Sequence, residues 1–173
     1  MNPNQAAFGK TGNYDRSAAL AYARRWALGR NPAYFDFTAL GGDCTNFVSQ
    51  VLYAGCGVMN FTPNYGWYYR DANQKSPSWT AVAFLYKFLT ENRERGPFAE
   101  LVSQNDLVIG DIIQLGFRQK GQFEHSLIVS KLESPIGPDK ISFTAHTHDL
   151  VDQKLTFYNY VDIRFLHILG CRS

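Results

Sequence analysis

The chain has 173 residues, of which 45% are hydrophobic, so it is long enough to bury one hydrophobic core and is expected to form one domain. Its 17 Lys and Arg residues are dispersed among 15 Asp and Glu residues, and the net charge of +2 argues against a protein that binds nucleic acid through a basic surface. No apolar stretch approaches the roughly 18 residues of a membrane span, and the N-terminus lacks the charged and apolar regions of a signal peptide.

The first half of the chain has the sequence pattern of helices. Apolar residues recur at helical spacing over residues 15–28, where an aspartate is the expected N-cap. The same spacing predicts helices over residues 44–55 and 78–93. Residues 30–40, which contain Asn-Pro and several aromatics, are predicted to form an ordered loop, and residues 57–77 are too irregular to be assigned to a helix or a strand.

The second half of the chain has the pattern of strands. After Gly96-Pro97 the period of the apolar residues changes from about 3.6 to 2, and short turn sequences favour antiparallel pairing. Helices followed by an antiparallel sheet of about five strands make an α+β domain, here expected over residues 14–173 after a poorly ordered extension of residues 1–13. The predicted strands cover residues 111–115, 125–132, 140–146, 154–158 and 164–169.

Cys44 follows the turn-forming residues Gly41-Gly42-Asp43 and stands in the first turn of the second predicted helix. A single cysteine is more often a small buried hydrophobe than a reactive group. Here, however, polar residues surround it, and the partial positive charge of a helix N-terminus favours a thiolate. Three cysteines leave at least one thiol outside any disulfide, and Cys44 is the natural candidate; Cys56 and Cys171 could be paired or could be free.

His125 opens a predicted strand 81 residues after Cys44 and is the expected general base. A third group should orient its imidazole, and the candidates lie in residues 145–149. Alternation along a strand places His146 and His148 on one face and Asp149 on the other. We expect His148 to face solvent at a strand end. No metal site or cofactor is expected, because no third and fourth ligand stands at a recognisable spacing.

A nucleophile at a helix start followed by a base at a strand start is the arrangement of papain-like hydrolases. The chain resembles the bacterial putative amidase domain family from about residue 14 to about residue 168. More distantly, it is similar to the NlpC-like and CHAP cell-wall peptidases. The motifs that carry the resemblance are Tyr14-Asp15-Arg16, Asn31-Pro32, Gly42-Asp43-Cys44-Thr45-Asn46-Phe47-Val48-Ser49-Gln50, Gly110-Asp111-Ile112-Ile113, His125-Ser126 and Ala145-His146-Thr147.

The resemblance implies a papain-like fold and catalytic roles for three residues. Cys44 would be the nucleophile and His125 the base, and the resemblance favours His146 as the third member, with Asp149 as the alternative because a carboxylate orients an imidazolium more strongly. Where the cell-wall peptidases have Ser-Gly after the cysteine, this chain has Thr45-Asn46, which leaves the exact substrate open.

The resemblance also implies binding roles around the nucleophile. Asp43 would recognise a substrate amine, although an N-cap is the simpler interpretation. The backbone N–H of Cys44 would form part of an oxyanion hole, with Tyr34 or Tyr14 as the second donor. Trp67, in an aromatic segment that is most simply core, could line a groove for a peptide or a sugar. His167 is expected to hydrogen-bond in or near the core.

These observations predict a cysteine amidase or peptidase that acts on peptide or peptidoglycan fragments. Two alternatives are an acyltransferase or thioesterase with the same dyad, and a non-catalytic cell-wall binding module. The resemblance favours an extracellular or cell-wall location, and a monomer is expected.

Overall fold

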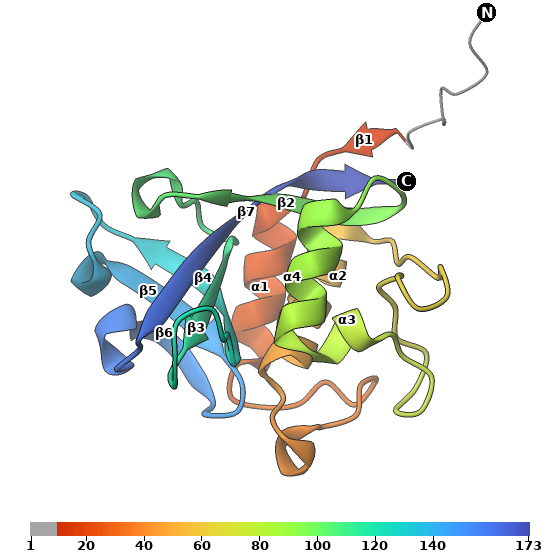
Figure 1. Cartoon of the computed structure of the whole chain (residues 1–173), viewed down its shortest axis with the longest axis horizontal. Coiled ribbons are helices and arrows are strands. Elements are labelled where there is room, and N and C mark those ends of the chain that lie inside the picture. The colour runs from red at the N-terminus through yellow and green to blue at the C-terminus, as the bar shows by residue number, and fades with distance from the viewer. Residues whose placement is uncertain (1–9) are drawn as a thin grey trace, which may run out of the picture.

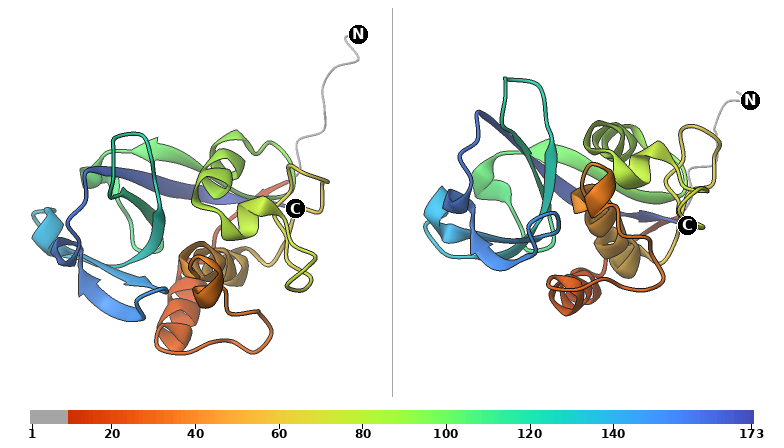
Figure 2. Two further views of the ribbon diagram at one scale, coloured as in Figure 1. Left: turned by 60° about the horizontal axis from the view of Figure 1, so that its bottom comes forward. Right: turned by 90° about the horizontal axis from the view of Figure 1, so that it is seen from below.

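The computed structural model describes residues 10–173 and has an α+β architecture, in agreement with the sequence analysis. The helices gather on one side of the molecule and a strongly bent, antiparallel sheet occupies the other (Figure 1). The two rotated views in Figure 2 show the same division, with the sheet curling away from the helices.

Four α-helices are present among residues 10–173: α1 (Arg16–Trp26), α2 (Cys44–Cys56), α3 (Pro77–Thr80) and α4 (Val82–Glu91). The predicted N-cap of α1 is confirmed, because Asp15 Oδ1 accepts a hydrogen bond from the Ala18 N–H at 2.9 Å. The third predicted helix is divided. Ala81 has an extended backbone, with φ of −117° and ψ of 129°, and separates α3 from α4.

Within the described part of the chain, seven strands form one sheet in the order β1-β7-β3-β4-β5-β6, with β2 pairing to the other side of β7. Every pair is antiparallel. The long strand β7 is central to the sheet because it pairs with β1, β2 and β3. The strand bounds are β1 (Thr11–Gly12), β2 (Gly96–Val102), β3 (Ile112–Gly116), β4 (His125–Leu132), β5 (Ile141–Ala145), β6 (Leu150–Lys154) and β7 (Asp162–Arg172).

The predicted strands are partly correct. β3, β4, β5 and β7 lie where strands were expected, but the strand predicted over 154–158 is wrong: β6 ends at Lys154, and residues 155–157 form a 3₁₀ turn. β2 was not predicted. β1 was also missed, and it places Thr11 and Gly12 of the expected N-terminal extension in the sheet, opposite Arg172 and Cys171. Residues 1–9 of that extension lie outside the described residues.

The sheet is buried on both faces, which explains its continuous apolar strands. Alternate residues of β3 and β4 point in opposite directions, so Ile112 and Ile128 pack with the helices, whereas Ile113 and Leu127 pack inside the curl of the sheet. The end of α2 is fixed to the sheet by the disulfide between Cys56 and Cys171. The helix and the central strands are thereby held together at the end opposite Cys44.

Candidate functional site

The N-terminus of α2 lies against the first residues of β4 and brings Cys44 and His125 to one cavity. The hydroxyl oxygens of Thr45 and Ser126 are 3.2 Å apart, and the Thr45 hydroxyl oxygen lies 3.7 Å from the Cys44 sulfur. Cys44 and His125 both line a cavity of about 470 Å³, called the Cys44 cavity below. Its other lining residues are Gly41, Phe117, Arg118, Glu124, Thr147, His148, Tyr158 and Asn159.

Two glycines form the turn that leads into α2. Gly41 and Gly42 have φ values of 109° and 120°, which glycine adopts more readily than other residues. A Cβ atom on Gly42 would lie 3.2 Å from the Thr147 hydroxyl, and that hydroxyl accepts a hydrogen bond from the Asp43 N–H at 3.0 Å. The turn therefore fixes the start of α2 against the segment that follows β5.

Cys44 is 7% exposed and is the free thiol of the chain. Burial raises the pKa of this thiol, and hydrogen bonds from the Ser126 N–H and the Thr45 hydroxyl act in the opposite direction. The sequence analysis predicted that the helix N-terminus favours a thiolate. In the structure the effect of burial is larger, so the neutral thiol is the resting form at neutral pH.

His125 is 6% exposed, and burial lowers its pKa from 6.5 to about 4, with a smaller contribution from nearby His148. The imidazole is therefore neutral at neutral pH. Its Nε2 atom lies 3.0 Å from the hydroxyl oxygen of Tyr158, which leaves Nδ1 as the nitrogen available for proton transfer. Burial raises the pKa of Tyr158 to about 12, so this partner stays a neutral phenol.

His146, predicted to orient His125, has other partners in the structure. Its Nδ1 atom lies 2.7 Å from Asp43 Oδ2, and its Nε2 atom lies 2.7 Å from the carbonyl oxygen of Trp26. Each ring nitrogen therefore has its own hydrogen-bond partner. The ring also stacks on Phe47, with ring centroids 3.9 Å apart. Because both nitrogens are occupied, His146 is not available to His125.

The alternative third member, Asp149, is also directed elsewhere. Its two carboxylate oxygens accept hydrogen bonds from Arg30 at 2.9 and 3.1 Å. His148, expected to face solvent, is exposed but lines the Cys44 cavity. His167 hydrogen-bonds beside the core as expected, with Nδ1 2.9 Å from an Asp111 oxygen.

Asp43 has neither of the roles expected for it. Its side chain is fully buried and does not cap α2. Its Oδ1 atom accepts hydrogen bonds from the Phe37 N–H at 2.9 Å and from the Asn46 side chain at 2.8 Å. With His146 on Oδ2, the carboxylate connects the 30–40 loop, α2 and the turn after β5, and it is not exposed to a substrate.

The aromatic residues proposed for substrate or oxyanion binding belong to the core. Trp67 is fully buried and packs on Trp79, with ring centroids 4.8 Å apart. Tyr34 stacks on the same Trp79 ring at 5.9 Å. The Tyr14 hydroxyl donates to the carbonyl oxygen of Gly110 at 3.4 Å. None of these side chains lines the Cys44 cavity.

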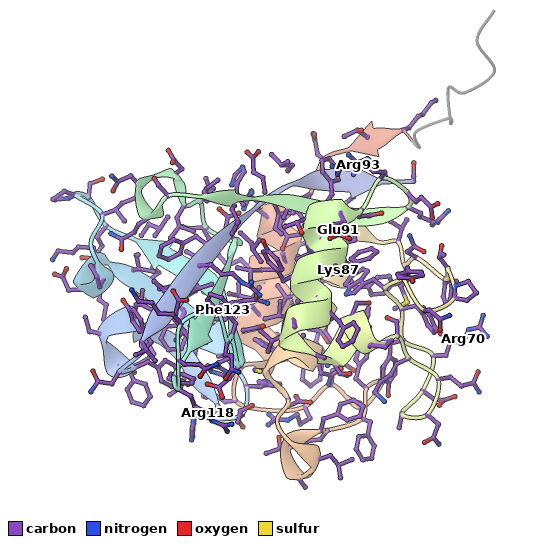
Figure 3. The ribbon with its side chains drawn as sticks, viewed as in Figure 1. Arg70, Lys87, Glu91, Arg93, Arg118 and Phe123 are labelled. Atoms are coloured by element: carbon purple, nitrogen blue, oxygen red, sulfur yellow. A yellow bond between two sulfur atoms is a disulfide. The ribbon has the colours of Figure 1, made fainter. Side chains whose placement is uncertain are left out.

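Much of the cavity wall is formed by residues that were not predicted from the sequence. Phe117, Arg118 and Glu124 come from the hairpin that joins β3 to β4, and Figure 3 shows Arg118 on this hairpin. Arg118 Nε and Glu124 Oε1 are 2.9 Å apart. The hairpin immediately precedes His125, and that proximity in sequence was an available signal. Tyr158 follows a 3₁₀ turn and has no local signature.

Within residues 10–173, no group of three or more His, Cys, Asp or Glu side chains is placed to hold a metal ion. Among the described helices, none is long and apolar enough to cross a membrane.

Comparison with known proteins matches residues 13–169 to the family described as "Putative amidase domain". The chain is also similar to the Bacillus subtilis (strain 168) protein described as "Uncharacterized protein YhbB", with 32% identity over 158 residues. This alignment covers 90% of the chain and 48% of the relative, so the chain spans about half the length of the curated relative it matches. No solved structure matches the chain.

Proposed function

Because this chain belongs to the "Putative amidase domain" family, we propose that it is a papain-like cysteine amidase that hydrolyses amide bonds through an acyl-enzyme on Cys44. The observation that carries the proposal is that Cys44, at the start of α2, and His125, at the start of β4, line one cavity. A thiol and an imidazole placed at one cavity are the nucleophile and base of this chemistry.

The reaction begins from a neutral thiol and a neutral imidazole, because burial raises the pKa of Cys44 and lowers that of His125. His125 Nδ1 takes the thiol proton, and the sulfur attacks the amide carbonyl carbon. The C–N bond breaks as His125 returns the proton to the leaving amine, which leaves a thioester on Cys44. His125 then removes a proton from water, whose oxygen attacks the thioester carbon. The C–S bond breaks, the carboxylic acid is released, and His125 returns the proton to the Cys44 sulfur.

Tyr158 is the group that we propose as the positioning partner of His125, in place of His146 or Asp149. For Nδ1 to accept the thiol proton, the hydrogen of the neutral ring must be on Nε2, and the Tyr158 oxygen at 3.0 Å accepts it. A phenol oxygen is a weaker acceptor than a carboxylate, so it fixes the ring without strongly raising the basicity of His125.

The first turn of α2 supplies the proposed oxyanion donor. N–H groups in the first turn of a helix have no intrahelical acceptor, and the Asp43 N–H is already bound to Thr147. The N–H of Cys44, next along the chain, is the donor that we assign to the oxygen of the tetrahedral intermediate.

Peptide amides, including those of peptidoglycan fragments, are the proposed substrates. The cavity combines an aromatic wall, Phe117 and Tyr158, with charges of both signs on Arg118 and Glu124, which suits a short peptide with charged groups. We further propose that residues 11–173, from β1 onward, act as one monomeric domain outside the cytoplasm. The Cys56–Cys171 disulfide supports that location, because disulfides persist in oxidising compartments.

The test compares wild type and Cys44→Ala on muropeptides and a panel of simple amides, with products identified by mass spectrometry. Asp149→Asn is the control, since its carboxylate pairs with Arg30 and does not contact His125. Cleavage by wild type and the control, but not by Cys44→Ala, supports the proposal. Cleavage by Cys44→Ala, or no cleavage of any amide by wild type, refutes it, and transfer to an added amine or alcohol identifies an acyltransferase.

A further inference from the structure

Three polar residues form a row across the three central strands and end beside Cys44. Arg164 of β7 is the register partner of Gln114 of β3, and Gln114 is the register partner of Ser126 of β4. Arg164 Nε and Nη2 lie 2.8 and 2.5 Å from Gln114 Oε1. Gln114 Nε2 lies 3.2 Å from the Ser126 hydroxyl oxygen. Gln114 and Ser126 are fully buried.

The row continues into α2. The Ser126 hydroxyl lies 3.2 Å from the Thr45 hydroxyl, and the Thr45 hydroxyl lies 3.7 Å from the Cys44 sulfur. Thr45 is 1% exposed. A continuous series of side-chain hydrogen bonds therefore connects a guanidinium on β7 with the sulfur at the start of α2.

When Cys44 is a thiolate, the chemistry of the two end groups fixes the direction of every bond between them. A guanidinium has only donors, so it must face the amide oxygen of Gln114. The Gln114 nitrogen then donates to both of its remaining partners, the Val82 carbonyl at 3.1 Å and the Ser126 hydroxyl. At the other end a thiolate can only accept, so Thr45 donates its hydrogen to the sulfur and accepts the hydrogen of Ser126.

Two aromatic rings hold Arg164 in place, and its guanidinium stays charged at neutral pH. Its guanidinium lies between the rings of Tyr86, at 3.5 Å, and Phe123, at 3.9 Å. Figure 3 shows Phe123 on the hairpin between β3 and β4. Burial lowers the pKa of Arg164 to about 10, so it remains a cation at neutral pH. The two rings restrict the guanidinium, and its fork is aimed at one acceptor.

We propose that Arg164, Gln114, Ser126 and Thr45 form a directed hydrogen-bond chain that stabilises the thiolate of Cys44. The four are positioning residues, since only Thr45 and Ser126 contact the sulfur and none touches the reacting carbonyl. The inference deepens the proposed function and rests on Cys44 as its nucleophile. It also gives a role to Thr45, at the position where this chain departs from the distant cell-wall peptidases.

Other ionisable groups also face Cys44 and act on it in every variant. His125 begins β4, and Glu124 is the residue before it. Arg118 lies on the hairpin between β3 and β4. His148 lies in the segment after β5, and Tyr158 lies in the segment before β7. Asp43, which precedes Cys44 on its own helix, raises the pKa of the thiol through its charge. The test therefore leaves these groups unchanged and alters only the chain.

The experiment titrates the Cys44 thiol by the pH dependence of iodoacetamide alkylation, with the labelled peptide identified by mass spectrometry. The disulfide leaves Cys44 as the free thiol, so the signal reports on one group. Thr45→Val should raise the pKa of Cys44 by about 1, because a hydrogen bond to a charged group is lost. Thr45→Ser, which keeps the hydroxyl, should restore the wild-type value. Arg164→Met should raise the pKa by a smaller amount.

Two matched controls isolate the chain. Thr90→Val makes the same change at a hydroxyl that bonds to its own helix, and Arg172→Met removes another guanidinium of β7 that stacks on an aromatic ring, Phe98. Neither should move the titration. The proposal is overturned if Thr45→Val titrates like wild type, or if Arg164→Met titrates like Arg172→Met. If Thr45→Val does not fold, the comparison of Arg164→Met with Arg172→Met decides.

Failure of this inference is distinguishable from failure of the proposed function. The titration needs no substrate, so the chain can be confirmed in a protein that cleaves no amide. Conversely, an unchanged titration in Thr45→Val leaves the amidase proposal intact, because that proposal depends on the loss of cleavage in Cys44→Ala.

Discussion

In mild acid the free energy of unfolding of the wild-type protein should fall because His125 is buried. The variant His125→Gln should not show this decrease. Burial lowers the pKa of His125 from 6.5 to about 4 in the folded state. Between these values the unfolded chain binds a proton that the folded protein does not, so the free energy of unfolding falls as the pH falls. The stability that the protein gains from keeping His125 neutral is fully present above pH 6.5 and is lost by about pH 4.

The size of this effect follows from the change in pKa. Each pKa unit corresponds to about 1.36 kcal/mol, so a change from 6.5 to about 4 is worth about 3 kcal/mol. The imidazole is 6% exposed, and solvent therefore screens this effect little. Urea unfolding of wild type and His125→Gln should be measured at a series of pH values from 7 to 4.

The difference between the two proteins is the informative quantity, because the other titrating groups are common to both and cancel. We expect His125→Gln to gain about 3 kcal/mol relative to wild type as the pH falls from 7 to 4. Parallel stability curves for the two proteins would refute the burial of a neutral imidazole and, with it, the proposed resting state of the site.

Three further predictions test the surroundings of the site. His146→Gln should lower the free energy of unfolding by about 3 kcal/mol, because it disrupts the buried hydrogen bonds of His146 with Asp43 and with the Trp26 carbonyl; urea unfolding measures this, and a loss near zero would contradict the assigned contacts. Tyr158→Phe should lower kcat by about tenfold and leave KM nearly unchanged, because His125 loses its positioning hydrogen bond; unchanged steady-state kinetics on a cleaved amide would contradict the role of Tyr158. Reduction of the Cys56–Cys171 disulfide, which spans 115 residues, should cost about 5 kcal/mol in denaturant unfolding, and equal stability of the oxidised and reduced protein would contradict that contribution.

The two residues of the proposed dyad were identifiable from sequence because each has a local signature. Cys44 follows a glycine turn and begins a helix, and His125 begins a strand whose apolar run, Leu127-Ile128-Val129, is typical of a buried strand. Both signatures depend on neighbours within a few residues. The sequence order of helix and strand then sufficed to predict that they belong to one α+β domain.

The partner of His125 could not be identified in this way. The predicted alternation of residues 146–149 was wrong, because β5 ends at Ala145 and a turn follows in which His146 is buried and His148 is exposed. Which side chain meets His125 depends on the path of the chain in this turn, where Thr147 has a φ of 84°. That turn directs His146 to Asp43 and exposes His148. Tyr158 reaches His125 from a segment 33 residues away, and no local pattern reports such a contact.

The unpredicted strand β2 has a comparable explanation. Its second residue is Pro97, which argues against a strand in the interior of a sheet. Within the described residues β2 pairs only with β7 and is therefore an edge strand, where a missing N–H is tolerated.

The role of Trp67 was also ambiguous in the sequence, because an aromatic cluster in an irregular segment fits a groove or a core. Its packing on Trp79 shows that it belongs to the core.

Formation of an acyl-enzyme is the most direct test of the proposed function. Wild type and Cys44→Ala should be incubated briefly with an activated ester or amide, quenched in acid, and analysed by intact mass and peptide mapping. The account predicts an added acyl group on the peptide that contains Cys44 in wild type and no adduct in Cys44→Ala. Substrate turnover with no acyl group on Cys44, or turnover that persists in Cys44→Ala, would contradict it.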